Sequence, residues 1–522
     1  MNSTEGLHAR QRELAVARPG KLRRVIGHLA ARRLNVVGLL LWAILIAAVV
    51  ASLRPPVPVI WGDTPPFLES ALRTLEAGRL TVVGGRDPGY PAILALTFGL
   101  NGDLHTVVLL QEATYAALIL ALAVTVQIVA GSPYALLSVI LLAMYPGVLM
   151  FRNVITAEMF YLVFLTLAVI GLLLATSAKE AVRLWLIAAA VLFAALATCC
   201  KSQGLFALVA VVALGFWLAW PYTPRRLVPV IFACVAALAL LVTLSRAGVA
   251  ASDRASAVFV AKTFFCNHLN IVFASKAAHR EIAAVAGSDA DEFTARLAAD
   301  FASKRGSWPM LGFFGDECFY DAGLDQYLTK THQNLSEAQP HDIAASYWRI
   351  FLAAVLDRPL RYVGKIGLQM AYGASVAWPP YGLEPTIPVS TDDVVHVAEI
   401  ASRHGVPALA SALDERPVRG WVLGNLGGVS IALFRGLSAA FIGCGILWIV
   451  AVASGRYAAF SVRGGILIVL WLASILTSAA AHTLDIWRYL VPSTPMVALM
   501  LSLSGVELAK AIGVHRRQMR GP

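Results

Sequence analysis

The chain has 522 residues, of which 58% are hydrophobic and only 14% are charged, and its mean hydropathy is +0.71. Soluble domains typically carry about 25% charged residues, so this composition excludes an ordinary soluble enzyme and predicts an integral membrane protein. The formal net charge of +11 does not indicate a nucleic-acid-binding protein, because the basic residues concentrate near the N-terminus and in short turns between apolar runs.

A helix needs roughly 20 apolar residues to cross a hydrocarbon core of about 30 Å. Ten predicted spans meet this need, namely 36–53, 105–130, 133–150, 156–176, 183–199, 204–220, 226–245, 436–453, 464–481 and 489–509. The sequence therefore predicts an all-α polytopic membrane protein, a bundle of ten transmembrane helices that would rise to 11 or 12 if further segments span.

Basic residues assign a side of the membrane to each loop. The basic N-terminal region is too long for a signal peptide and shows no clear cleavage site, so we expect it in the cytoplasm. Later basic groups fall on the same side if 246–435 lies wholly outside, namely Lys179 with Arg183, Arg225 with Arg226, Arg456 with Arg463, and the tail from Lys510. Alanine- and arginine-rich composition with short loops suggests a bacterial inner (plasma) membrane with both termini cytoplasmic.

These sides divide the chain into a cytoplasmic N-terminus (1–35), a transmembrane module (36–245) with a first outer loop (54–104), an extracytoplasmic, mainly helical segment (246–435), C-terminal transmembrane helices (436–510) and a cytoplasmic tail (511–522). Segment 359–378 is apolar but contains Arg361 and Lys365. A span there would invert every later loop, so we expect an interfacial or re-entrant helix, with a further span as the alternative.

The six cysteines fall into two groups. Four lie in or at the ends of predicted spans, namely Cys199, Cys200, Cys234 and Cys444. Cys266 and Cys318 lie in the outer segment, where an oxidising compartment permits a disulfide between them, and we predict that bridge.

Charged residues gather at the outer ends of the predicted spans. Asp63 follows the first span closely enough to reach the membrane face, where its carboxylate could accept a proton; alternatively it caps a helix that begins at Pro65. Glu158 could likewise be a site residue, or it could simply be an acid that the helix dipole favours in the first turn of a helix. Lys201 and Arg488 are outer cations, against the usual charge bias, which suggests an anionic partner such as a lipid phosphate.

Signs of metal or nucleotide chemistry are weak. Asp289 and Asp291 form an acid-x-acid pair, but an acidic first turn of a helix explains it more simply. The outer histidines lack the spacing of a structural zinc site, and the sequence contains no Walker loop or glycine-rich phosphate cradle. The sequence therefore predicts no cofactor, but it does not exclude a bound divalent metal ion.

The order of several short motifs resembles the GT-C superfamily of integral membrane glycosyltransferases, especially the branch of protein mannosyltransferases and the lipid A aminoarabinose transferase. The motifs are the acidic Asp63, Arg-x-Pro-x-Tyr-Pro at 86–91, Thr-x-Glu at 156–158, Lys-Ser-Gln-Gly at 201–204, Pro-Leu-Arg-Tyr at 359–362 and Arg-Tyr-Leu-x-Pro at 488–492. Each motif is weak alone, and the specific part is their order and their shared outer side.

This resemblance implies an inverting transfer of a sugar from a polyprenyl-phosphate donor to an extracytoplasmic lipid, glycan or protein, carried out by the module 36–245. Asp63 would be the general base, and Arg86, Lys201 and Arg488 would bind the donor phosphate. The implied walls of the site are Tyr90, Glu112, Arg152, Glu158, His482, Asp485 and Tyr489. No second acid stands immediately beside Asp63, which departs from the metal-dependent members.

Two other functions compete with this interpretation. A transporter or flippase for a lipid-linked glycan would place its ionisable residues near the middle of the bilayer, whereas here they gather at the ends of spans. A non-catalytic scaffold of an envelope assembly would tolerate Asp63→Asn. Each function implies contact with membrane lipids, and none implies nucleic acid.

Overall fold

The computed structural model describes residues 58–60, 62–83, 86–101, 103–129, 151–220, 222–286, 290–304, 318, 340–374, 386–387, 391–406, 418–419, 428–454, 458–481 and 493–519. Almost all the regular structure in these ranges is helical. The exceptions are two short strands, β1 (Thr386–Ile387) and β2 (Val418–Arg419), which pair antiparallel, and one parallel bridge between Val59 and Val154. The fold class is all-α, as predicted.

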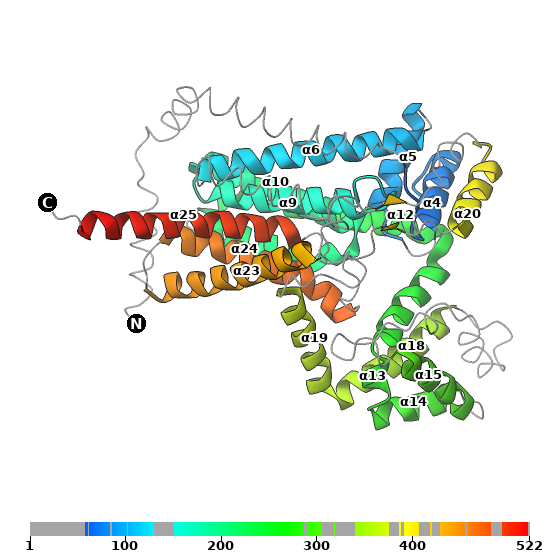
Figure 1. Cartoon of the computed structure of the whole chain (residues 1–522). Helices are drawn as coiled ribbons and strands as arrows, with labels where there is room; N and C mark the ends of the chain where they lie inside the picture. The colour runs from blue at the N-terminus through cyan, green and yellow to red at the C-terminus, as the bar shows by residue number, and fades with distance from the viewer. Residues whose placement is uncertain are drawn as a thin grey trace.

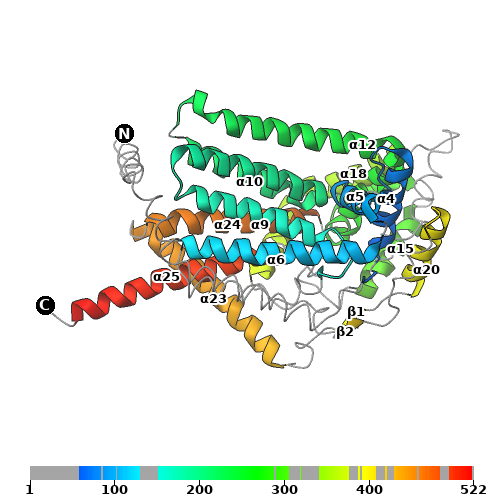
Figure 2. The ribbon, with the colours of Figure 1, turned by 90° about the horizontal axis from the view of Figure 1, so that it is seen from above.

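A bundle of long helices dominates the molecule (Figures 1 and 2). It contains α6 (Leu104–Val129), α9 (Glu158–Ala175), α10 (Glu180–Cys200), α11 (Leu205–Ala219), the first half of α12 (Val228–Cys266), α23 (Gly428–Ser454), α24 (Ala458–Ala481) and α25 (Thr494–Met519). These helices carry eight of the ten predicted spans, and the other two, 36–53 and 133–150, lie outside the described residues.

Length and composition allow five described segments to cross a membrane, namely Leu104–Val129, Glu158–Ala175, Glu180–Cys200, Ser202–Ala219 and Phe460–Ala481. Shorter apolar stretches occur at Gly89–Leu100, Val228–Leu244, Ala439–Ser454 and Thr494–Leu508. Large apolar side chains on α12, such as Phe232 and Leu238, are 70% and 63% exposed. Such a surface needs an apolar surrounding, so the chain is a multi-pass membrane protein.

Helix α9 forms the centre of the bundle. In α9, 83% of the apolar stretch is buried inside the protein, whereas in α6 the buried share is 44%. A glycine allows α9 and α10 to pack closely, because a Cβ on Gly171 would lie 3.0 Å from the carbonyl oxygen of Leu186 and 3.1 Å from Cβ of Ala190. Small residues at such crossings let helix backbones approach within the membrane.

Basic residues that the sequence assigns to one side of the membrane lie at one end of the bundle. At one end the turns carry basic residues: Arg463 donates from Nε to Oγ1 of Thr176 over 3.1 Å, and Arg183 donates from Nη1 to the hydroxyl of Tyr222 over 2.9 Å. The C-terminal end of α25 lies at this end too (Figure 1). The predicted site residues that the structure describes lie at the opposite end, where α9 begins and α10 finishes.

Two helices of the first outer loop cover that opposite end, α4 (Thr64–Ala77) and α5 (Gly89–Asn101). Val59, just before α4, adds a short parallel bridge to Val154: its N–H donates to Asn153 over 2.9 Å, and its carbonyl accepts from Ile155 over 3.0 Å. The loop is thereby fastened to the entrance of α9.

Helix α12 does not stop where the predicted span ends. It runs unbroken for 39 residues and carries the chain out of the bundle towards the outer helices (Figure 1). Those helices are α13 (Leu269–Val272), α14 (Lys276–Ala286), α15 (Ala290–Lys304) and α18 (Pro340–Asp357). They enclose a hydrophobic core separate from that of the bundle, around Phe265, Ile282 and Tyr347.

Helix α19 (Pro359–Ala374) joins this outer domain to the bundle. Its 16 residues span about 24 Å, which is less than a hydrocarbon core. Tyr362 donates its hydroxyl to the carbonyl of Ala480, and the buried Lys365 donates to that of Ala479 over 2.9 Å. Because α19 docks on the end of α24 through Tyr362 and Lys365, the interfacial placement stays the preferred prediction.

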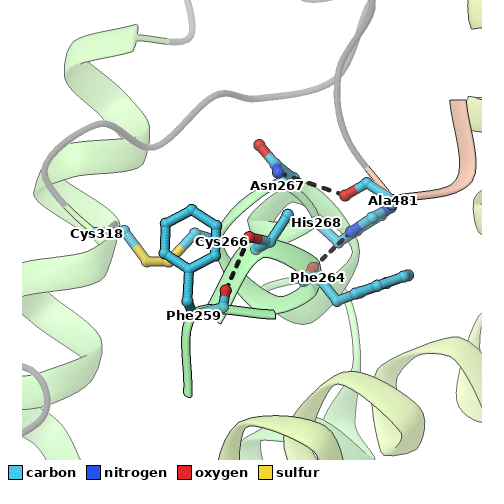
Figure 3. The surroundings of a disulfide bond; sticks show 8 residues. Phe259, Phe264, Cys266, Asn267, His268, Cys318 and Ala481 are labelled. Carbon is cyan, nitrogen blue, oxygen red and sulfur yellow. Dashed lines mark hydrogen bonds between the residues drawn. A yellow bond between two sulfur atoms is a disulfide. The ribbon is translucent and has the colours of Figure 1, made fainter. Parts of the chain in front are cut away.

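Cys266 and Cys318 form a disulfide within the outer domain, the pair that the sequence predicts (Figure 3). The bridge closes a loop of the chain with a sequence separation of 52 and ties residue 318 to the end of α12. Next to it, the Asn267 side chain donates to the carbonyl of Ala481, which connects the same helix end to α24.

We expect Cys318→Ser to destabilise the outer domain by about 2–5 kcal/mol, because the unfolded chain then regains the entropy that the closed loop removes. Limited proteolysis with and without reductant measures the effect. Reductant should bring the wild-type protein to the level of the variant. Cys234→Ser, at a cysteine that forms no disulfide, serves as the control. Equal protease resistance of Cys318→Ser and wild type would contradict the prediction.

Candidate active site

Asp63 and Arg86 form an ion pair between two parts of the first outer loop. The Oδ1 atom of Asp63 lies 2.9 Å from Nη2 of Arg86, and both side chains keep about a fifth of their surface exposed. Asp63 precedes α4, yet its side chain makes no capping hydrogen bond to that helix. The capping alternative therefore does not account for this carboxylate, which faces a cation instead.

Two aromatic rings hold the guanidinium of Arg86 in place. Its Cζ atom lies 5.5 Å from the ring centre of Phe67 on α4 and 5.7 Å from that of Phe259 on α12. Cation–π contacts of this kind fix the plane of the guanidinium. Phe67 in turn packs edge-on against Tyr90, whose ring centre is 5.0 Å away.

Lys201 pairs with Glu158 across the ends of α10 and α9. The Nζ atom of Lys201 lies 2.7 Å from Oε1 of Glu158, whose side chain is only 2% exposed. Lys201 stands in the sharp turn between α10 and the 3₁₀ turn η1 (Ser202–Gly204). Glu158 does occupy the first turn of α9, as the simple alternative holds, and it also fixes the predicted phosphate-binding cation.

The turn at Lys201 is shaped by two glycines. A Cβ on Gly204 would lie 2.9 Å from Oγ1 of Thr198, and a Cβ on Gly89 would lie 2.7 Å from the backbone of Cys199. Both distances are shorter than real side-chain contacts, so larger residues would push the segments apart. Gly89 thus lets the start of α5, shortly after Arg86, pack against the end of α10.

Asp87 lies at this meeting point and was not among the predicted site residues. Its Oδ2 accepts the backbone N–H of Ser202 over 2.8 Å. Loss of water around the carboxyl raises the pKa of Asp87 to about 6, and the hydrogen bonds of Ser202 and the charges of Lys201 and Arg86 only partly oppose this rise. The only sequence signal was its place inside the motif 86–91.

Arg152 and Glu112 form a third pair at the entrance of α9. Nε of Arg152 donates to Oε2 of Glu112 over 2.8 Å, and Nη2 contacts the same oxygen. The guanidinium also lies 5.1 Å from the ring centre of Tyr115. Arg152 is only 3% exposed, so its side chain supports the site from within the protein and does not face solvent.

Gln111, also absent from the predicted residues, organises the backbone beside this pair. Its Nε2 donates to the carbonyls of Arg152 and Val154 over 2.8 and 3.0 Å, and its Oε1 accepts the hydroxyl of Tyr90 over 3.1 Å. A buried glutamine that satisfies both functions of its amide keeps α5, α6 and the strand-like segment before α9 in register.

Several buried polar atoms around these pairs have no hydrogen-bond partner within the described residues. They are Nε of Arg86, Oγ1 of Thr156, the hydroxyl of Tyr161 and Nε2 of Gln203. Buried polar groups are almost always paired in folded proteins. Such atoms, close in the chain to the ion pairs, are those that a polar ligand could satisfy.

A cavity of about 310 Å³ opens beside this site, between α4 and α20 (Thr391–Arg403). Its polar lining comes from Glu69, Arg73, His396 and Arg403. Burial opposes ionisation of Glu69, but the hydrogen bonds and charges of Arg73 and His404 outweigh it and hold the pKa of Glu69 below its usual value. This network docks α20 on the helix that follows Asp63.

The remaining predicted residues lie outside the described ranges: Arg488, His482, Asp485 and Tyr489. Within the ranges that are described, no three His, Cys, Asp or Glu residues come together as a metal site. Asp291 lies in the first turn of α15, as its simpler interpretation holds.

Comparison with known proteins finds similar solved structures only at low similarity. A crystal structure of ArnT from Cupriavidus metallidurans in the apo state is 14% identical, covers 89% of this chain and 77% of its own, and gives a TM-score of 0.34. ArnT bound to undecaprenyl phosphate is 11% identical, covers 93% and 80%, and gives the same TM-score. No protein-family model and no curated protein matches the sequence. Likeness at this level supports no inference about function, which depends instead on the chain's own geometry.

Proposed function

We propose that this protein is a membrane-embedded glycosyltransferase that moves a sugar, with inversion, from a polyprenyl phosphate to an extracytoplasmic acceptor. The observation that carries the proposal is the meeting of Asp63, Arg86 and Lys201 at one end of an apolar helix bundle. A general base and two cations at the membrane face are what such a transfer requires.

The reaction assigns a role to each charge. As the acceptor hydroxyl attacks the anomeric carbon, its proton passes to the carboxylate of Asp63, and the bond from that carbon to the phosphate oxygen breaks. The electron pair stays on the phosphate, so negative charge grows there. Arg86 and Lys201 are positioned donors for this charge, and such donors act most strongly in the transition state.

Arg86 retains a donor for a phosphate. Guanidinium carries five N–H bonds, and Nε of Arg86 has no partner within the described residues. Lys201 adds a second positive charge, which Glu158 holds in place over 2.7 Å. The site also lies at the ends of α9 and α10, where a lipid with its chain in the bilayer places its phosphate.

Two measurements test the function. Purified protein incubated with a synthetic polyprenyl-phosphate sugar and an envelope extract should release polyprenyl phosphate, which mass spectrometry detects. Mass spectrometry of envelope glycolipids and glycoproteins from a deletion strain should show one class that lacks a sugar, which identifies the acceptor. Movement of the intact donor across vesicles without cleavage would instead support a flippase and overturn the proposal.

A further inference from the structure

The cavity between α4 and α20 is built from two distant parts of the chain, which lie side by side in the structure (Figure 1). His404 on α20 fastens them together: its Nδ1 lies 2.6 Å from Oε1 of Glu76, and its Nε2 lies 3.3 Å from Oε2 of Glu69. Val397 and Ile400 of α20 are buried in the same hydrophobic core as the bundle helices. Both walls of the cavity are therefore held in place by packing and by charge.

Two arginines give the cavity its chemical character. Nε of Arg73 donates to Oε1 of Glu69 over 2.6 Å, and Nη1 of Arg403 lies 3.7 Å from Oε2 of the same carboxylate. In the ranges that the structure describes, the Nη groups of Arg73 donate no hydrogen bond, and Arg403 donates none at all. One carboxylate thus lies between two guanidinium groups that keep N–H donors for a ligand.

The acidic residues nearby leave these donors available. Asp392 and Glu399 on α20 are exposed, do not line the cavity, and form no ion pair with Arg73 or Arg403 among the described residues. Glu76 also lies outside the lining, and its contact is with His404. A ligand that satisfies two guanidinium forks is an anion with paired oxygens.

The cavity begins close to the proposed base. Pro65 and Pro66, in the first turn of α4, form part of its wall, and Asp63 immediately precedes that helix. Arg73 lies further along α4, about 15 Å from Asp63 at 1.5 Å per residue. Because Asp63 faces Arg86, a ligand held at the arginines would extend along α4 and pass over its first turn to bring a hydroxyl to the carboxylate.

We propose that this cavity is the acceptor subsite and that it binds a phosphate or carboxylate group of an anionic glycan acceptor. The inference rests on the proposed function. The anionic group would lie a short oligosaccharide's length from the hydroxyl that attacks, and none of its bonds is made or broken. Arg73 and Arg403 therefore determine which acceptor binds, whereas Asp63 and Arg86 act on the reacting atoms. The headgroup of an anionic phospholipid has the same chemistry, and the experiment below separates the two sources.

The test uses the full chain in nanodiscs of phosphatidylcholine, with the soluble probes glucose 6-phosphate, glucuronate and glucose titrated by ligand-observed NMR. At least one anionic probe should bind, and glucose should not. Arg403→Gln should weaken that binding by about tenfold or more, because a charge-assisted hydrogen bond is lost. It should fold as wild type, because 59% of the Arg403 side chain is exposed. Arg79→Gln, at an exposed arginine of the same outer loop that does not line the cavity, should bind the probes as wild type does.

Several outcomes would overturn the inference without touching the proposed function. They are absence of anion binding, equal binding of glucose, and unchanged anion binding in Arg403→Gln. A second arm replaces part of the lipid by phosphatidylglycerol at about 0.3 M salt, which screens the surface charge. Loss of anion binding there, relative to phosphatidylcholine at the same salt, would assign the cavity to a lipid headgroup and overturn the acceptor role.

A third arm connects the cavity to sugar transfer. The anionic probe that binds should inhibit release of polyprenyl phosphate when an envelope extract supplies the acceptor, and glucose should not. Binding without inhibition would contradict the acceptor role while the transfer itself stands. Absence of any polyprenyl phosphate release by wild type would instead overturn the proposed function, and with it the acceptor role, even where the cavity binds the anion.

Discussion

Replacing Asp63 by asparagine is expected to lower the rate of sugar transfer by about 10²–10⁴-fold, the usual contribution of a positioned proton acceptor. The amide cannot accept the proton of the acceptor hydroxyl. The variant should still fold, because Asp63 makes no capping hydrogen bond to α4. It should also still bind the donor, because Arg86 loses its carboxylate partner and becomes more available to phosphate.

Single-turnover rates and lipid-phosphate affinity, measured side by side, check this result. Asp103→Asn is the matched control, since it makes the same chemical change in the same outer loop at an exposed position. Wild-type turnover in Asp63→Asn would remove the catalytic role of this residue. A variant that neither turns over nor folds would point to a structural role instead.

Lys201→Met should have the second large effect, and it should appear in both binding and stability. Loss of a charge-assisted hydrogen bond to phosphate weakens donor affinity by about 10–100-fold. The change also leaves Glu158 buried without its cation, which costs about 3 kcal/mol of folding stability, at the low end for a buried pair because Lys201 keeps some contact with solvent.

A second substitution separates the two effects. Lys201→Met with Glu158→Gln removes both charges, so thermal stability should recover towards wild type while donor affinity stays low. Lys179→Met, an exposed lysine at the opposite end of the bundle, should leave lipid-phosphate affinity unchanged. Recovery of affinity in the double variant would show that Lys201 only holds Glu158 and does not contact the donor.

How far the site could be predicted is seen best at the first outer loop. Asp63 was expected in it because a carboxylate at the membrane face could accept a proton, and Arg86 because its motif at 86–91 resembles one of the GT-C superfamily. Their direct pairing was not expected, since 22 residues of α4 and loop separate them. Asp87 was overlooked although it stands next to Arg86, because its contact lies 115 residues away at Ser202.

Other features of the fold also divide into those that the sequence predicts and those that only the tertiary structure shows. Hydropathy indicated a span at 226–245 but not the continuation of α12 to Cys266, since polar residues beyond the membrane carry no strong helical pattern of their own. The Cys266–Cys318 pair could be named because only two cysteines lie in the outer segment. The docking of α20 through Glu69 and His404 had no signal in the sequence.

The sequence by itself determined the membrane class, the position of most spans, and the gathering of basic turns at one end of the bundle. The bilayer imposes these features on any short window of residues, through the length of apolar runs and the placement of basic loops. Only the tertiary structure decided which charges meet, because close approach at Gly89 and Gly204 brings distant turns together. The helix bundle was therefore predictable, while the arrangement of Asp63, Asp87 and Lys201 was not.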